Sequence, residues 1–128
     1  MNILKATFAT LLLLLLTSTA AVAAPIDFTQ EKFDKLMAEN KPVLIDIAAD
    51  WCPTCQRQAT LLGPMMQEDA FKDITVLRVD FDDQKDVVKA LKATRQSTLV
   101  IFNDGAEVDR SIAETNEERL RTFVSQLK

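Results

Sequence analysis

The sequence predicts an α/β fold in which a central mixed sheet of about four strands has helices on both faces. Three observations predict this fold class. Segments with apolar residues at helical spacing alternate along the chain with short, continuous apolar runs. The run at 43–48 is almost wholly apolar, as in a strand that is covered on both faces. The turn sequence Asn103-Asp104-Gly105 separates the last two strands and predicts an antiparallel hairpin.

The first predicted helix covers residues 30–39. Phe33 and Leu36 recur there at helical spacing behind Thr29, a residue type that caps helix N-termini. The apolar run 43–48 follows this helix and is predicted to be the first strand of the sheet.

A longer helix is predicted from residue 52 to about residue 69. Gly63 and Pro64 lie inside it and are expected to kink or divide it. The second strand is predicted at 74–81, and a further helix follows around residues 87–91.

The last two strands are predicted at 98–102 and 108–112. Thr115 and Glu118 have the spacing of a capping box, which predicts that the final helix begins there. The apolar stripe of that helix consists of Leu120, Phe123, Val124 and Leu127. The order α-β-α-β-α-β-β-α predicts parallel pairing through helical crossovers together with one antiparallel hairpin.

The N-terminal segment has the plan of a secretory signal peptide. Lys5 precedes an apolar run with six consecutive leucines, and small residues follow that run. Residues 21–23 read Ala-Val-Ala, an A-x-A cleavage site, so we expect residues 1–23 to be removed and 24–128 to form one exported domain. The alternative is an uncleaved membrane anchor, because residues 6–24 just reach spanning length.

The composition excludes several kinds of chemistry. The chain of 128 residues contains no histidine, so a Cys–His or Ser–His dyad and a histidine metal ligand are excluded. The net charge of −4 and the lack of a Lys/Arg cluster argue against nucleic acid as a partner. Catalysis must therefore depend on cysteine, carboxylate, lysine or hydroxyl groups.

The only two cysteines enclose a proline and a threonine shortly after the buried strand 43–48. Cys52 is expected in the first turn of a helix, where unpaired N–H groups and the helix dipole stabilise a thiolate and lower the pKa. Pro53 falls where a helix tolerates proline best, and Thr54 completes the motif. Cys55 lies one turn along the same face, so we interpret Cys52 as the nucleophile and Cys55 as the resolving thiol.

Two other interpretations compete with this one. A purely structural disulfide between Cys52 and Cys55 would close a loop of four residues and contribute only about 2 kcal/mol. Half of a metal site would need two more Cys or His ligands, and this chain has none.

The run Lys41-Pro42-Val43-Leu44-Ile45-Asp46, followed by Trp51-Cys52-Pro53-Thr54-Cys55, resembles the thioredoxin family. The resemblance covers about residues 28–128. Within the family, the chain most resembles the exported thioredoxin-like proteins and the periplasmic thioredoxin-like domain of membrane thiol reductases. It implies a thioredoxin-like fold and a periplasmic thiol–disulfide oxidoreductase, of the protein-disulfide reductase type. It also implies no cofactor beyond the Cys52–Cys55 disulfide, oxidised protein cysteines as substrates, and a membrane thiol reductase as electron donor.

The resemblance carries three further residues over by position. Asp46 matches the family's buried acid, and burial should raise its pKa and make it a proton acceptor for Cys55; the alternative is an Asp at a strand edge that points to water. Arg78 stands where many members have a lysine near that acid, or is an ordinary solvated strand residue. Trp51 shields the disulfide and offers a flat contact surface, or caps the core.

The chain departs from the family where a cis-proline faces the dithiol, because Ser97 stands in its place. A cis bond before a residue other than proline costs about 3 kcal/mol, so we expect the Gln96–Ser97 bond to be trans. Gln96, Ser97 and Thr98 are the candidate substrate groove. The Ser97 hydroxyl could hydrogen-bond a thiolate, or the smaller residue could make room for a metal or iron–sulfur cluster shared by two chains.

Three functions follow from these observations. The first is a monomeric thiol–disulfide oxidoreductase. The second is a metal or iron–sulfur dimer that uses the same cysteines and Ser97. The third is a non-catalytic interaction module whose disulfide only rigidifies the first helical turn.

Overall fold

Five strands form one mixed sheet in the order β1-β3-β2-β4-β5. The computed structural model describes residues 24–128, so the predicted signal peptide at 1–23 lies outside the described residues. The strands are β1 (Ile26–Asp27), β2 (Val43–Ala48), β3 (Thr75–Asp80), β4 (Thr98–Asn103) and β5 (Ala106–Ile112). The sheet thus has one strand more than the predicted four, because the two-residue β1 pairs with the edge of β3.

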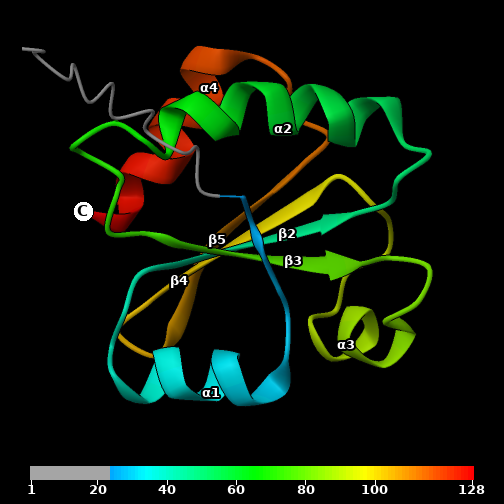
Figure 1. Cartoon of the computed structure of the whole chain (residues 1–128), viewed down its shortest axis with the longest axis horizontal. Coiled ribbons are helices and arrows are strands. Elements are labelled where there is room, and N and C mark those ends of the chain that lie inside the picture. Colours follow the sequence, from blue (N-terminus) through cyan, green and yellow to red (C-terminus); the bar gives the residue numbers. More distant parts are fainter. Residues whose placement is uncertain (1–23) are drawn as a thin grey trace, which may run out of the picture.

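Helices cover both faces of the sheet, as predicted. They are α1 (Gln30–Ala38), α2 (Pro53–Met65), α3 (Lys85–Ala90) and α4 (Glu117–Val124), and a short 3₁₀ turn, η1 (Ser125–Leu127), follows α4. In Figure 1, α1 and α3 lie on one side of the sheet and α2 and α4 on the other. Within residues 24–128 no helix combines the length and the apolar character that a membrane crossing requires.

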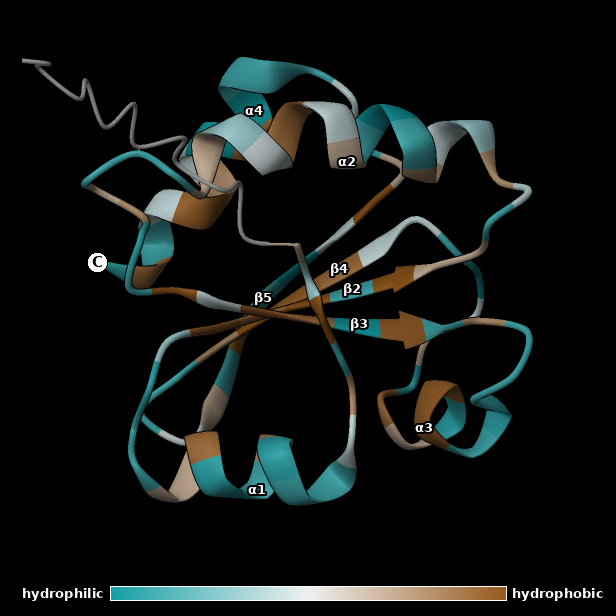
Figure 2. Ribbon diagram, in the orientation of Figure 1, coloured by the Kyte–Doolittle hydropathy of each residue, from teal (hydrophilic) through white to brown (hydrophobic). Residues whose placement is uncertain are grey.

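The central strand β2 determines which side chains face the helix α2. It pairs in parallel with β3 and antiparallel with β4, and all six of its residues are buried. Leu44 packs in the cluster that contains α2 and α4 residues, whereas Ile45 and Ile47 pack in the cluster on the α1 and α3 side. Figure 2 shows the apolar colour concentrated on the central strands. Because strand residues alternate between the faces, Asp46 points to the α2 side.

Helix α2 does not have the predicted extent. It runs without interruption through Gly63 and Pro64 and ends at Met65, so the expectation that this pair divides the helix is wrong. Pro64 lies in the last turn of α2, and the helix ends one residue later. The chain then continues to β3 through turns rather than a helix to residue 69.

The predicted capping box of Thr115 and Glu118 is wrong, and the N-cap of the last helix lies one residue later. Asn116, and not Thr115, is the N-cap of α4, because its Oδ1 accepts a hydrogen bond from the backbone N–H of Arg119 at 3.0 Å. An amide side chain at this position caps a helix as well as a hydroxyl does.

Replacing Asn116 by alanine is expected to lower the free energy of unfolding by about 1 kcal/mol, because one N–H of the first turn loses its acceptor. Urea unfolding of the two variants Asn116→Ala and Thr115→Ala measures this. Thr115→Ala is the matched control and should have little effect; a larger loss in Thr115→Ala than in Asn116→Ala would contradict the assignment of the cap.

Candidate functional site

The two cysteines lie at the N-terminus of α2, shortly after the end of β2. Cys52 is the N-cap of the helix, and its Sγ accepts the backbone N–H of Cys55 at 3.1 Å. Cys52 and Cys55 are joined by a disulfide, with their Cα atoms 5.3 Å apart, and both are buried. Pro53 occupies the first helical position, as predicted, and is exposed, while Thr54 is half-buried.

Ser97 lies against both sulfur atoms. Its Oγ is 3.1 Å from Cys52 Sγ and 3.2 Å from Cys55 Sγ, and the residue is fully buried. The Gln96–Ser97 peptide bond is trans, as the sequence predicts for a residue other than proline. Ser97 has a φ of 60°, in the left-handed region that residues with a side chain rarely adopt.

The other two residues of the predicted groove have different surroundings. Thr98 is buried, and its hydroxyl donates to the Arg95 carbonyl at 2.7 Å, so it holds the turn before β4 in place. Gln96 is half-buried. Of the three predicted groove residues, Ser97 is the one that the structure brings into contact with the cysteines.

Gln58 belongs to the site and is not identified by the sequence. It is fully buried on α2, one turn after Cys55, and its Nε2 donates to the carbonyls of Ser97 at 3.3 Å and Glu114 at 3.1 Å. The signal in the sequence is a polar residue on the face of α2 that also carries Cys55, Leu62 and Met65. That pattern cannot reveal which carbonyls the amide reaches, because they come from segments 39 and 56 residues later in the chain.

Asp46 is buried in the middle of the sheet. Burial raises its pKa from 3.8 to about 6, and the charge of nearby Arg78 opposes this rise. Its Oδ1 has no hydrogen-bond partner among residues 24–128, and the residue lines a cavity of about 290 Å³ together with Leu62 and Met66 of the α2 side and Val76 of β3. The alternative that Asp46 points to water from a strand edge is wrong, because β2 is the central strand.

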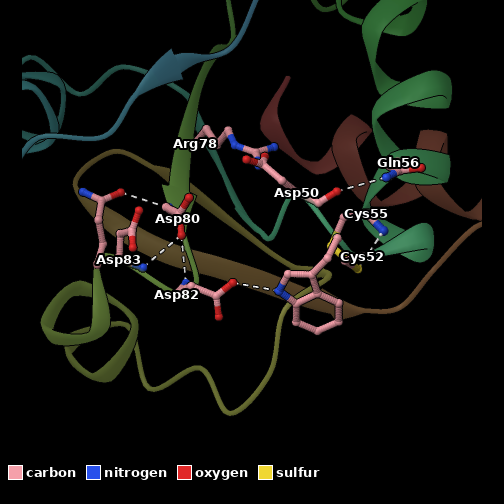
Figure 3. A network of polar contacts seen from close by, with 10 residues as sticks. Asp50, Cys52, Cys55, Gln56, Arg78, Asp80, Asp82 and Asp83 are labelled. Carbon is pink, nitrogen blue, oxygen red and sulfur yellow. Dashed lines mark hydrogen bonds and ion pairs between the residues drawn. A yellow bond between two sulfur atoms is a disulfide. The ribbon is translucent and has the colours of Figure 1, made fainter.

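Arg78 is the register partner of Asp46 on β3, but its guanidinium bonds to a different carboxylate. Its Nη2 donates to Asp50 Oδ1 at 2.8 Å, and the Asp50 carbonyl accepts from Gln56 Nε2 at 3.0 Å. Figure 3 shows Asp50 between Arg78 and the start of the cysteine helix. Arg78 therefore both acts on the pKa of Asp46 and fixes the loop that precedes the cysteines.

Trp51 presents its ring to solvent next to the disulfide. The residue is 60% exposed, so the alternative that it caps the core is wrong. Its indole Nε1 donates to Asp82 Oδ2 at 2.7 Å. The carboxylate of Asp80 accepts the N–H groups of Asp82 and Asp83, which lowers the pKa of Asp80 and orders the loop that holds the indole. The ring is thus a fixed, flat, exposed surface.

This arrangement suits two-electron sulfur chemistry. Two cysteines in one helical turn can alternate between a disulfide and a dithiol, and the helix N-terminus and Ser97 supply hydrogen bonds to a thiolate. Among residues 24–128, no three His, Cys, Asp or Glu side chains lie together as a metal ion would require.

Comparison with known proteins gives the same family throughout. The family model described as Thioredoxin matches residues 24–126. The thioredoxin of Mycobacterium tuberculosis strain H37Rv is 31% identical over 106 residues, covering 82% of this chain and 90% of that protein. A Thioredoxin H-type of Fagopyrum esculentum is 34% identical over 92 residues, covering 70% of this chain and 76% of that protein.

Solved structures agree in fold. Trxlp from Edwardsiella tarda EIB202 is 38% identical, with a TM-score of 0.75, and the match covers 77% of this chain and 97% of that one. The thioredoxin of Fasciola hepatica is 29% identical, with a TM-score of 0.67, covering 77% of this chain and 93% of that one. Thioredoxins use their own cysteine pair as the redox centre and reduce disulfides in protein substrates. The chain belongs to the thioredoxin family and is a thiol–disulfide oxidoreductase whose redox pair is Cys52 and Cys55.

Proposed function

We propose that this oxidoreductase is an exported protein-disulfide reductase that works as a monomer in the bacterial periplasm. The environment of Cys52 Sγ carries the exchange chemistry, and the reducing direction is proposed from the thioredoxin relatives, which reduce disulfides in protein substrates. Cys52 Sγ accepts the N–H of Cys55 and lies 3.1 Å from the Ser97 hydroxyl, and together these groups favour a thiolate at this sulfur. The exposed Trp51 beside it supplies a contact surface for a folded protein substrate.

The reaction follows from the positions of the two sulfurs. In the dithiol form, the Cys52 thiolate attacks one sulfur of a substrate disulfide, which forms a mixed disulfide and releases one substrate thiolate. Cys55 then loses its proton and attacks Cys52 Sγ, which releases the second substrate thiolate and restores the Cys52–Cys55 disulfide. Two electrons pass from the cysteine pair to the substrate, and each released thiolate takes up a proton.

Asp46 is proposed as the acceptor for the Cys55 proton. Its pKa of about 6 leaves the carboxylate ionised at neutral pH yet basic enough to hold a proton transiently. The carboxylate lies on the α2 side of β2 and lines a cavity that also reaches residues 24 and 25, which gives the proton a way out of the core.

Export and the electron donor are proposed from the sequence. The basic residue, the leucine run and the A-x-A site at 21–23 support secretion, and an oxidising compartment requires a supply of reducing equivalents. A membrane thiol reductase would provide them by reducing the Cys52–Cys55 disulfide through the same exchange.

An insulin-reduction assay tests the catalytic part. The reduced protein is expected to cleave insulin disulfides, and Cys52→Ser, which lacks the nucleophile, should reduce them no faster than the buffer control. A wild-type protein without activity, or a Cys52→Ser variant with full activity, would contradict the reductase proposal.

Fractionation of bacteria that express the full chain tests export. The expected product is found in the periplasmic fraction and begins at Ala24. A chain that keeps residues 1–23 and stays with the membrane would favour the anchor instead. Gel filtration of the purified protein reports whether it is a monomer.

A further inference from the structure

Ser97 is held at two points, one on its hydroxyl and one on its carbonyl. We propose that the Ser97 hydroxyl is a catalytic group that bridges the two sulfurs in the dithiol form, and that Gln58 is the residue that positions it. The inference rests on dithiol–disulfide exchange by Cys52 and Cys55, and it is independent of the compartment and of the direction of electron flow.

The hydroxyl has better partners in the reduced form than in the oxidised form. It lies 3.1 Å from Cys52 Sγ and 3.2 Å from Cys55 Sγ, but it has one proton, and neither sulfur of a disulfide carries one. In the disulfide, it therefore donates to one weak acceptor at a time. In the dithiol, it donates to the Cys52 thiolate and accepts the S–H of Cys55, so both short contacts become hydrogen bonds.

The proton and electron balance defines this state. Reduction of the disulfide by an external dithiol adds two electrons and one proton to the pair. The proton resides on Cys55, and the negative charge resides on Cys52, where the N–H of Cys55 and the hydroxyl of Ser97 both point. Because hydrogen bonds to charged acceptors are stronger than those to neutral ones, Ser97 stabilises the dithiol more than the disulfide.

The backbone of Ser97 needs support to keep the hydroxyl in this place. A left-handed conformation at a residue with a side chain persists only where its surroundings impose it, and such residues cluster at functional sites. The Ser97 carbonyl accepts from Gln58 Nε2 at 3.3 Å and from the Ala113 N–H at 2.9 Å. The cysteine helix and the segment after β5 thus hold Ser97 between them.

Gln58 is an unusual residue for its position. Its side chain is fully buried, and in the described part of the chain its Oε1 has no hydrogen-bond partner, although a buried polar atom without a partner is destabilising. An apolar side chain would avoid that cost on this face of α2. Its Nε2 also donates to the Glu114 carbonyl, so the amide ties the Ser97 turn to the start of the next segment. Gln58 touches neither sulfur and acts through Ser97.

Removal of the hydroxyl tests the first half of the proposal. In Ser97→Ala, the Cys52 thiol is expected to become about tenfold less acidic, since a hydrogen bond to a charged acceptor is lost. The ultraviolet absorbance of the thiolate during a pH titration of the reduced protein measures this directly. The dithiol–disulfide equilibrium against glutathione should move about tenfold toward the disulfide, which corresponds to a reduction potential about 30 mV more negative.

Two further variants separate the hydroxyl from folding effects. Ser97→Gly also lacks the hydroxyl but adopts a φ of 60° freely, so it should fold well and show the same shift of the titration. Ser125→Ala is the matched control, because it removes a serine hydroxyl that donates to the Arg121 carbonyl in α4. Unchanged thiolate titrations in both Ser97 variants would overturn the proposal.

A double-mutant cycle tests Gln58. Gln58→Met has a similar volume and cannot donate to the Ser97 carbonyl, so it should shift the titration in the same direction as Ser97→Ala but by less. Added to Ser97→Ala, it should produce no further shift, because it acts through the absent hydroxyl. If Gln58→Met shifted the thiolate titration equally in the wild-type protein and in Ser97→Ala, Gln58 would have a purely structural role. The titration is independent of insulin reduction, so failure of the proposed reductase function would be seen separately.

Discussion

A Cys55→Ser variant is expected to stop after the first exchange and to accumulate as a mixed disulfide with its protein substrate. The Cys52 thiolate still attacks the substrate. The hydrogen bond to Cys52 Sγ comes from the backbone N–H of residue 55, so the substitution retains it. The second step has no nucleophile, since a serine hydroxyl at this position is not ionised at neutral pH. Multiple turnover in the insulin assay should therefore fall to the rate of the buffer control.

Non-reducing gel electrophoresis after incubation with an oxidised protein substrate detects the trapped species. A band at the summed mass of the two proteins, which disappears on addition of dithiothreitol, is the expected result. Cys52→Ser is the matched control, because it keeps one thiol of the pair, that of Cys55, but removes the sulfur that caps α2 and accepts the N–H of residue 55. Trapping by Cys52→Ser instead of Cys55→Ser would reverse the assigned roles of the two cysteines.

Much of this fold follows from local patterns in the sequence. The predicted limits of β2 match the observed ones, because a run that is apolar except for Asp46 and precedes the cysteines has few other interpretations in a chain of this size. The two-residue β1 is missed, because a strand this short has no pattern of its own and forms only beside β3. The predicted cap of α4 falls one residue early, since Thr115 and Asn116 are both good capping residues and the choice depends on the direction from which the chain arrives.

The site also has features that the sequence predicts and features that it does not. The cysteine pair, the position of Asp46 and the trans bond before Ser97 depend on local order in the sequence and on one known family pattern. The contacts of Gln58, the exposure of Trp51 and the pairing of Arg78 with Asp50 depend on how distant segments pack, and no spacing in the sequence encodes them. Gln58 shows this most clearly, because its partners lie on two segments that meet only in the folded chain.

Replacing Asp46 by asparagine is expected to stabilise the protein at neutral pH. The pKa of Asp46 is raised from 3.8 to about 6 by burial, so between these values the folded state holds a proton that the unfolded state has lost. The unfolding free energy contributed by this group therefore falls as pH rises from about 4 to about 6. Above about pH 7, ionised Asp46 lowers the unfolding free energy by its full amount, about 3 kcal/mol. Below about pH 4, this loss vanishes. Asp46→Asn removes the charge and hence this loss.

The measurement is the difference in unfolding free energy between Asp46→Asn and wild type, from urea denaturation at several pH values. Taking the difference matters because other groups change the unfolding free energy with the opposite sign at the acid end of the series. Bonds from Arg119 hold the pKa of Glu114 at about 2, so Glu114 contributes stability that is lost as pH falls. That contribution is the same in both proteins and cancels. The exposed Asp73 provides the control, and Asp73→Asn should show no such difference.

The same variant should be slower in catalysis while it is more stable. Without the carboxylate, the proposed acceptor of the Cys55 proton is lost, and we expect resolution of the mixed disulfide to slow by about a hundredfold at neutral pH. Stopped-flow measurement of that step should show a wild-type rate that rises through about pH 6, as the carboxylate ionises, and a variant without this rise. Greater stability with an unchanged rate would show that Asp46 is buried for another reason. A rate loss without the gain in stability would show that Asp46 lacks the raised pKa that its burial implies. The two readouts are separate, because the stability difference depends on the buried carboxylate charge, whereas the rate depends on transfer of the Cys55 proton.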